Sequence, residues 1–244
     1  QFPHVWQSIF SESKQSAYTL DQQSITHPID TEVLTTANAN NNFDAITYDK
    51  GASTLKQLRH LLGEDVFREG VHNYLSKYAY KNASLNDFID SLSTAAKRDL
   101  HQWTQQWLYS AGVNTIAAKY TCSNGKIKQF NLQQSAASAA LPDLREQRVQ
   151  VAAFKLNKQK LDHIKTVAVI YKGASTAVPE LVGIACADVV YPNYQDWAYV
   201  RVRMDDNSFD IAKNKVRSVR DPLLRAMIGQ HLWDGVAEGS VQRS

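Results

Sequence analysis

The sequence predicts an α+β protein with more than one domain, in which a helical bundle is followed by a small β-sandwich and then by further helices. Three stretches of different apolar spacing indicate this order. Apolar residues recur at helical spacing up to Gly112, alternate with polar residues from Val113, and return to helical spacing from Asp205. We therefore expect domains at residues 1–112, 113–204 and 205–244.

Composition indicates an ordinary globular protein. Of its 244 residues, 43% are apolar and 21% are charged, and the formal net charge is +3. This charge is too small to favour nucleic acid or a membrane surface as a partner, and the chain has no apolar run long enough to span a bilayer. We expect no nucleic-acid partner and no membrane segment in this chain.

Capping signals divide the first 112 residues into helices. Gly63 is expected to end one helix and start the next, while Ser84 and Asp87 have the spacing of a capping box. Asp99 is expected to cap a further helix that closes at Gly112. The expected helices are residues 3–22, 45–62, 64–78, a segment from 84 and a segment from 99. The second of the two helices joined at Gly63 is expected to bury Val66, Phe67, Val71, Tyr74, Leu75 and Tyr78.

From Val113 onward, the alternation of apolar and polar residues predicts short strands. Asn124 and Gly125 form a strong hairpin signal between segments 116–121 and 126–133. Further strands are expected at residues 148–156, 166–171, 181–187 and 197–204, with a low-complexity connection at 134–143. Cys122 and Cys186 do not form a cysteine framework; low cysteine usage favours reduced thiols and leaves a bridge open.

Tyr48 is the candidate catalytic residue. It lies near the N-terminal end of the helix that starts at Ala45, where a phenol is placed to donate a hydrogen bond to a developing oxyanion. Gly51, which has no side chain, is expected to let another backbone approach this turn closely. The alternative is a structural tyrosine at the edge of the core, with its hydroxyl bonded to a backbone carbonyl. His27, a lone histidine before Pro28, is expected to be a turn residue bonded to backbone.

Several sequence blocks carry a family resemblance. They read I-T-Y-D-K-G-A-S-T-L-K-Q-L, L-G-E-D-V-F-R-E-G, Y-K-N-A-S-L-N-D-F, D-L-H-Q-W-T-Q-Q-W-L and S-A-G-V-N-T-I, with T-H-P-I upstream. In this order they resemble the aminopeptidase N family of zinc metallopeptidases (gluzincins), and the block ending in G-V-N-T-I resembles its bacterial branch. The resemblance implies the C-terminal half of a thermolysin-like catalytic domain, a small β-sandwich, and the truncated start of a C-terminal helical domain. It also implies that Tyr48 stabilises the tetrahedral oxyanion.

One departure from the family pattern concerns the metal. The family holds zinc on an H-E-x-x-H helix and a later glutamate, and this sequence has no such motif. Its seven histidines include no pair at i, i+4. We therefore expect a fragment downstream of the metal site, with zinc in the full-length parent and none bound by this chain.

The resemblance sets the remaining expectations about function. The parent would hydrolyse the N-terminal peptide bond of peptides with a free N-terminus, in peptide catabolism, and this chain alone would be inactive. Its partner would be the upstream half of its own catalytic domain; without it, the exposed apolar face is expected to cause self-association. A cytoplasmic location is expected. No metal ligand is assigned, and the substrate-binding residues remain unknown.

Besides an aminopeptidase, the sequence bears on two other classes of function. The chain could be a non-catalytic interaction module, a helical bundle with a β-sandwich in which Tyr48 is structural. A serine or cysteine hydrolase has little support, because the sequence contains no G-x-S-x-G motif and neither cysteine lies at a helix start or beside a histidine.

Overall fold

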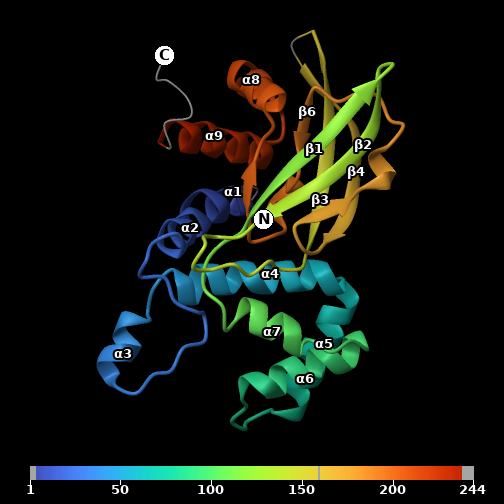
Figure 1. Ribbon diagram of the computed structural model, residues 1–244. Helices are drawn as coiled ribbons and strands as arrows, with labels where there is room; N and C mark the ends of the chain where they lie inside the picture. The colour runs from blue at the N-terminus through green and yellow to red at the C-terminus, as the bar shows by residue number, and fades with distance from the viewer. Residues whose placement is uncertain (1–3, 159, 238–244) are drawn as a thin grey trace.

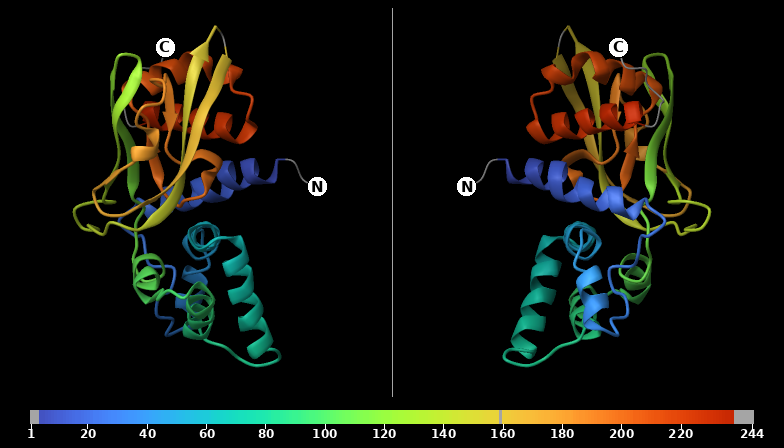
Figure 2. Two further views of the ribbon diagram at one scale, coloured as in Figure 1. Left: turned by 90° about the vertical axis from the view of Figure 1, so that its right-hand side faces the viewer. Right: turned by 90° about the vertical axis from the view of Figure 1, so that its left-hand side faces the viewer.

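The computed structural model describes residues 4–158 and 160–237, which form an α+β fold of helices and two small sheets. In Figure 1 the helices between residues 36 and 107 lie below the sheets, and the last two helices lie beside the sheets. The N-terminal helix runs between the two halves and packs against both (Figure 2). It therefore joins the helical half to the half that contains the sheets.

Helices occupy most of the chain before β1. In chain order they are α1 (Val5–Ser8), η1 (Ile9–Lys14), α2 (Gln15–Asp21), α3 (Thr36–Asn41), η2 (Ile46–Lys50), α4 (Gly51–Leu62), α5 (Glu64–Lys77), α6 (Leu85–Ala96) and α7 (His101–Trp107). Gly63 separates α4 from α5 with a φ of 92°, a value that glycine adopts at little cost. At the start of α6, Ser84 and Asp87 form the expected capping box. Helix α5 approaches α6 at Gly70, where an added Cβ would lie 2.6 Å from Leu92 Cδ2.

The segments η1 and η2 are π-helical turns that continue directly into α2 and α4. In η2 the Lys50 amide donates to the Ala45 carbonyl five residues back, at 2.9 Å. Each π turn ends on a lysine that is almost fully buried, Lys14 at 2% exposure and Lys50 at 0%. Buried ammonium groups need a charged partner, and both π turns therefore require one elsewhere in the fold.

The sheet half contains a four-stranded and a three-stranded sheet. The first has the order β5-β2-β1-β7 and the second the order β4-β3-β6. The strands are β1 (Thr115–Ser123), β2 (Lys126–Ser135), β3 (Gln147–Asn157), β4 (Lys160–Tyr171), β5 (Ser175–Ala177), β6 (Val189–Tyr191) and β7 (Arg201–Arg203). Strand β7 pairs with β1 in parallel, and the other neighbours are antiparallel. The hairpin of β1 and β2 turns at Asn124 and Gly125, as the sequence predicted.

Helices α8 (Asp206–Lys215) and α9 (Pro222–Ala237) complete the sheet half, with the short 3₁₀ turns η3 (Pro179–Leu181), η4 (Tyr194–Asp196) and η5 (Val216–Ser218) between elements. Buried residues of both sheets, α8, α9 and Phe10 share one hydrophobic cluster. A second cluster holds the helices together and includes Leu58, Leu92 and Trp107. None of the helices in the described part of the chain has the length and hydrophobicity to cross a bilayer.

The α+β class and the period change near Val113 are confirmed, since the last helix before the sheets ends at Trp107 and β1 begins at Thr115. The strand expected at residues 181–187 is wrong. Pro179 starts a 3₁₀ turn there, and Gly183 follows with a φ of 87°, so the stretch forms a loop before β6. The domain limits, the sandwich assignment and the truncated last domain stay predictions.

Two helical expectations also differ from the structure. Helix α3 was not expected, because its Asn-rich sequence has no apolar face; Thr35 caps it by accepting from the Asn38 amide at 3.1 Å. The expected buried face of α5 is only half covered, since the helix packs on α6 through Gly70, and Leu75 is 61% exposed.

Cys122 and Cys186 form a disulfide across 64 residues, so the preference for reduced thiols is wrong. Cys122 lies in β1 and Cys186 in the loop before β6. The Cys186 amide donates to the Gly125 carbonyl at 2.8 Å, so the backbone already brings this loop against the hairpin. Periodicity could not give this contact, because the two cysteines meet only after the sheets form.

Candidate functional site

Tyr48 lies in the π turn η2, where the helix of the predicted site begins. Its side chain is 52% exposed, and its ring meets the edge of Phe43 at a centroid distance of 4.7 Å. The described residues offer its hydroxyl no hydrogen-bond partner. The structural alternative, a tyrosine at the core edge bonded to a carbonyl, therefore does not describe Tyr48.

An apolar groove of about 590 Å³ lies beside Tyr48. It is lined by α4 and its π turn, by α6 and α7, and by the segment after Pro28. Its apolar lining residues are Ile29, Ala52, Leu55, Leu85, Phe88, Ile89, Trp103 and Leu108. A groove of this size and lining suits a peptide side chain.

Asp44 starts the turn that carries Tyr48. Its Oδ1 accepts hydrogen bonds from the amides of Ile46 and Thr47, at 2.9 and 3.1 Å. These are the amides that a helix start leaves without an intrahelical partner, so Asp44 acts as the cap of η2. Its second oxygen, Oδ2, lies 2.9 Å from Nε2 of His27. His27 thus contacts backbone, as expected, and also a carboxylate that the sequence did not connect to it.

Lys50 ends the same turn in the protein interior. Its Nζ lies 3.0 Å from Asp21 Oδ2, and both side chains are fully buried. Burial lowers the pKa of Lys50 to about 8, against the opposing effect of Asp21. The turn around Tyr48 is therefore held at its start by Asp44 and at its end by Lys50.

Asp21 connects this turn to the sheets. Its Oδ1 accepts from the Gly112 amide at 2.8 Å and from the Thr26 hydroxyl at 2.6 Å. The Tyr199 hydroxyl donates to Oδ2 at 3.2 Å, and burial raises the pKa of that phenol well above its usual value, so it stays a donor. Asp21 thus joins the helix α2, the turn of Tyr48 and the segment that leads into β1.

Arg145 holds the same segment from the other side. It is 1% exposed and donates to the carbonyls of Gln106, Ser110, Ala111 and Gly112 and to Asn114 Oδ1. Its guanidinium also lies 5.2 Å from the Trp107 ring centroid. The connection from α7 to β1 is therefore fixed by a buried cation that is fully hydrogen-bonded.

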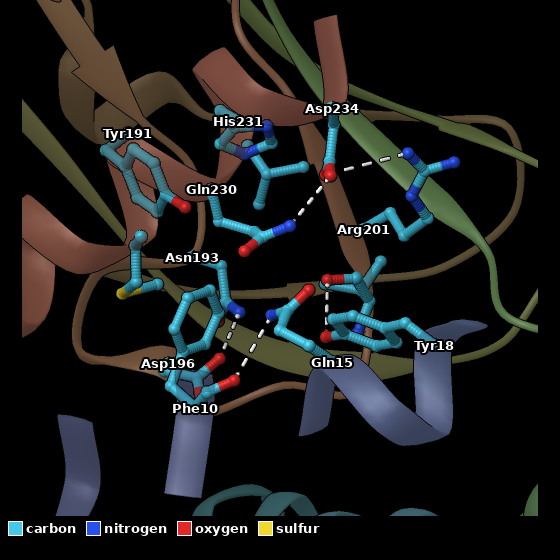
Figure 3. Close-up of a pocket in the computed structure, with 13 residues that line it drawn as sticks. Phe10, Gln15, Tyr18, Tyr191, Asn193, Asp196, Arg201, Gln230, His231 and Asp234 are labelled. Carbon is cyan, nitrogen blue, oxygen red and sulfur yellow. Dashed lines mark hydrogen bonds and ion pairs between the residues drawn. The ribbon is translucent and has the colours of Figure 1, made fainter. Parts of the chain in front are cut away.

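A second cavity lies where η1, η4 and α9 meet, and it is much smaller (Figure 3). Its volume is about 20 Å³, which is room for about one water molecule. Tyr191 and Gln230 lie at this cavity, and Gln230 donates to Asp234 Oδ1 at 2.9 Å. Burial raises the pKa of Tyr191 well above its usual value. This cavity is too small for a peptide, so the groove at Tyr48 is the better candidate site.

The described residues do not fit a zinc ion. Within 4–158 and 160–237, no three His, Cys, Asp or Glu side chains come together as a metal would need. The His27 pair with Asp44 supplies two such groups and no third.

Two details of the sequence interpretation change at this site. A Cβ on Gly51 would lie 3.9 Å from Ile29 Cγ2, an ordinary contact with a side chain, so the expected close backbone approach is wrong. Sequence reasoning also missed Asp21 and Lys50. The sequence did contain one signal for Lys50. Lys50 follows Ile46 by four residues, so both side chains lie on the same face of the turn, and Ile46 is buried.

Comparisons with known proteins agree with the sequence blocks. Residues 2–107 match the Peptidase family M1 domain. The chain is 34% identical over 241 residues to Aminopeptidase N of Streptomyces lividans, covering 96% of this chain and 28% of that protein. It is 39% identical over 124 residues to Aminopeptidase 2 of Candida albicans, covering 51% of this chain and 13% of that protein. It is 40% identical over 119 residues to Probable aminopeptidase 1 of Sulfurisphaera tokodaii, covering 47% of this chain and 15% of that protein. The chain therefore spans less than a third of the length of each relative.

Proposed function

Because the chain belongs to the aminopeptidase N-like proteins of peptidase family M1, we propose that it supplies the oxyanion-binding tyrosine and part of the peptide groove of an aminopeptidase. The observation that carries the proposal is Tyr48, a half-exposed phenol without a hydrogen-bond partner among the described residues, at the edge of an apolar groove. The relatives are named aminopeptidases, and the matched part is 28% of the Streptomyces lividans protein, so the activity of the whole is part of the proposal.

Family M1 is zinc-dependent in general, and the residues described here do not fit the metal. We propose that zinc belongs to the complete gene product that contains residues 1–244, and that residues outside the described ones hold it. Residues 1–244 alone would then be inactive.

Tyr48 would act when the scissile carbonyl is attacked. The attack places negative charge on the former carbonyl oxygen, and a donor already in position stabilises that charge more than it stabilises the neutral carbonyl. The free hydroxyl of Tyr48 can supply this hydrogen bond without first breaking one inside the protein. The hydrogen bonds to Asp44 and the ion pair of Lys50 hold the turn of Tyr48 in place, so little reorganisation is needed at the moment of reaction.

The apolar groove would bind the substrate next to that oxygen. Leu55 and Phe88 contribute apolar surface, and Thr47 adds a polar group beside Tyr48. A substrate side chain in the groove displaces water from the neighbourhood of the Tyr48 hydroxyl, which strengthens its hydrogen bond to the developing charge.

The test is Tyr48→Phe in the complete gene product, with an aminoacyl chromogenic amide as substrate. We expect kcat to fall by roughly 10² to 10³, the usual loss when one oxyanion donor is removed, with KM and zinc content little changed. Tyr80→Phe is the matched control, because Tyr80 is fully exposed on the loop between α5 and α6. A Tyr48→Phe enzyme with a kcat within threefold of the wild type would exclude the proposed role.

Residues 1–244 alone are assayed beside the complete gene product. Turnover by the complete gene product and none by residues 1–244 alone would support the proposal that this chain supplies Tyr48 and that other residues of the gene product hold zinc. Absence of turnover by both would favour the non-catalytic interaction module.

A further inference from the structure

We propose that His27 is a positioning residue that holds the Asp44 cap and thereby the turn of Tyr48. The proposal rests on the proposed function, since it assigns His27 a role in placing the Tyr48 hydroxyl. Its basis is the geometry of the two contacts that the imidazole makes. Neither contact depends on a bound ligand.

Both ring nitrogens of His27 face oxygens that accept hydrogen bonds. Nδ1 lies 2.7 Å from the carbonyl oxygen of Pro28, and Nε2 lies 2.9 Å from Asp44 Oδ2. A carbonyl cannot donate, and an ionised carboxylate cannot donate either. A neutral imidazole carries one N–H and would leave the other nitrogen lone pair facing an oxygen. The imidazolium form has two N–H groups and satisfies both contacts.

Asp44 passes this contact on to the turn of Tyr48. One carboxylate oxygen faces His27, and the other accepts from the amides of Ile46 and Thr47. The Tyr48 amide itself donates to the Asp44 main-chain carbonyl at 3.1 Å. Without a donor at position 27, Asp44 would be held on one side only, and its carboxylate could rotate away from the two amides.

The groups around His27 leave Asp44 as its charged partner in the described structure. Asp21, which contacts the neighbouring Thr26, is paired with Lys50, and Asp30 pairs with the Tyr109 hydroxyl. The side chains of His27 and Asp44 are each 22% exposed, so the pair lies near the surface and replacing His27 leaves no large cavity in the core. We call the contact of His27 with Asp44 the His27 clamp.

The first test measures hydrogen exchange of the Ile46 and Thr47 amides in residues 1–244 by NMR, at one pH, in the wild type and in two variants of His27. We expect His27→Leu, which cannot donate, to lose protection about fivefold, the size of a lost helix cap. In His27→Gln the amide nitrogen can still donate to Asp44, so protection should stay near that of the wild type. His72→Leu, at an exposed site on α5, is the matched control and should behave as the wild type.

The second test measures kcat and KM in the complete gene product. We expect kcat to fall in His27→Leu and to recover in His27→Gln, while KM changes little in both. Rescue by the variant that restores the donor is a readout that a loss of packing alone would not give.

The two tests separate the two proposals. Equal amide protection in the wild type and His27→Leu would overturn the His27 clamp whatever the activity. The expected protection pattern together with a normal kcat for Tyr48→Phe would support the clamp and reject the proposed function of Tyr48. Should His27→Leu fail to fold, direct NMR observation of a hydrogen-bonded Nε2–H proton on the wild-type His27 ring supports the proposal, and its absence contradicts it.

Discussion

Replacing Lys50 with methionine should lower the free energy of unfolding by about 3 kcal/mol, because it breaks a buried ion pair from one side. Methionine has nearly the length of lysine and is apolar, so the cavity it leaves is small. The main cost is Asp21, which keeps its charge in the interior. Three other donors remain on Asp21, the Gly112 amide and the hydroxyls of Thr26 and Tyr199, so the loss should lie at the lower end of the range for such pairs.

The matching substitution at Lys14 tests this reasoning. Lys14 Nζ lies 2.6 Å from Asp196 Oδ1 and also donates to the Ala198 carbonyl at 2.6 Å. Without it, Asp196 retains an Asn193 donor at 3.4 Å and the Lys56 ammonium at 3.7 Å, which are weaker contacts. Lys14→Met should therefore cost more than Lys50→Met, about 4 to 5 kcal/mol.

Urea unfolding at pH 7, followed by tryptophan fluorescence and circular dichroism, measures both losses. Lys77→Met is the control, because Lys77 is exposed on α5 and should change stability by less than about 0.5 kcal/mol. A loss below about 1 kcal/mol for Lys50→Met, or a smaller loss at Lys14 than at Lys50, would refute the reasoning.

The pH dependence gives a second check on Lys50. Burial lowers its pKa in the folded protein from 10.5 to about 8. Between these values the unfolded chain holds a proton that the folded chain has released, so stability rises with pH. The desolvation penalty of the charged ammonium is therefore relieved above pH 8. The neutral Lys50 amine can still donate to Asp21, which methionine cannot, so the wild type should gain stability relative to Lys50→Met between pH 8 and about 9.5.

Two further predictions concern the two halves of the fold. The disulfide Cys122–Cys186 closes a separation of 64 residues, so its removal in the Cys122→Ser, Cys186→Ser double variant should cost about 4 kcal/mol in urea unfolding; a loss below about 1 kcal/mol contradicts this. Gly70→Ala should destabilise by about 1 kcal/mol, because its Cβ would lie 2.6 Å from Leu92 Cδ2 and 3.0 Å from Leu92 Cα, which outweighs the gain in helix propensity. Gly229→Ala in α9, where an added Cβ meets nothing within 4 Å, should raise the thermal midpoint instead; the same sign for both variants would refute the packing argument.

The elements that the sequence predicted correctly are those whose partners lie nearby in the chain. The capping box of Ser84 and Asp87 spans three residues, and the hairpin turn at Asn124 and Gly125 joins adjacent strands. Gly63 likewise separates two helices by a local backbone preference. Each of these signals is complete within a few residues, so no knowledge of the tertiary structure is needed to interpret it.

The contacts that place the candidate site join distant parts of the chain and could not be predicted in this way. Lys14 meets Asp196 across 182 residues, and the Gly112 amide meets Asp21 across 91. Tyr48 was identified by its sequence block, but nothing local indicated that His27 would reach the Asp44 cap. The parallel pairing of β7 with β1 likewise depends on the path of the intervening strands.

The inward face of η2 and α4 is not wholly apolar. Leu55 is 41% exposed, whereas Ile46, Lys50 and Gln57 are fully buried. Their spacing of four and seven residues is that of one helix face, so the inward face here is partly polar. Tyr48 lies two residues from both Ile46 and Lys50, which places it on the opposite side of the turn, toward the groove. The burial of Lys50 therefore determines the outward direction of Tyr48. A methionine at this position keeps a buried side chain on the same face, so it should lower stability without turning Tyr48 away from the groove.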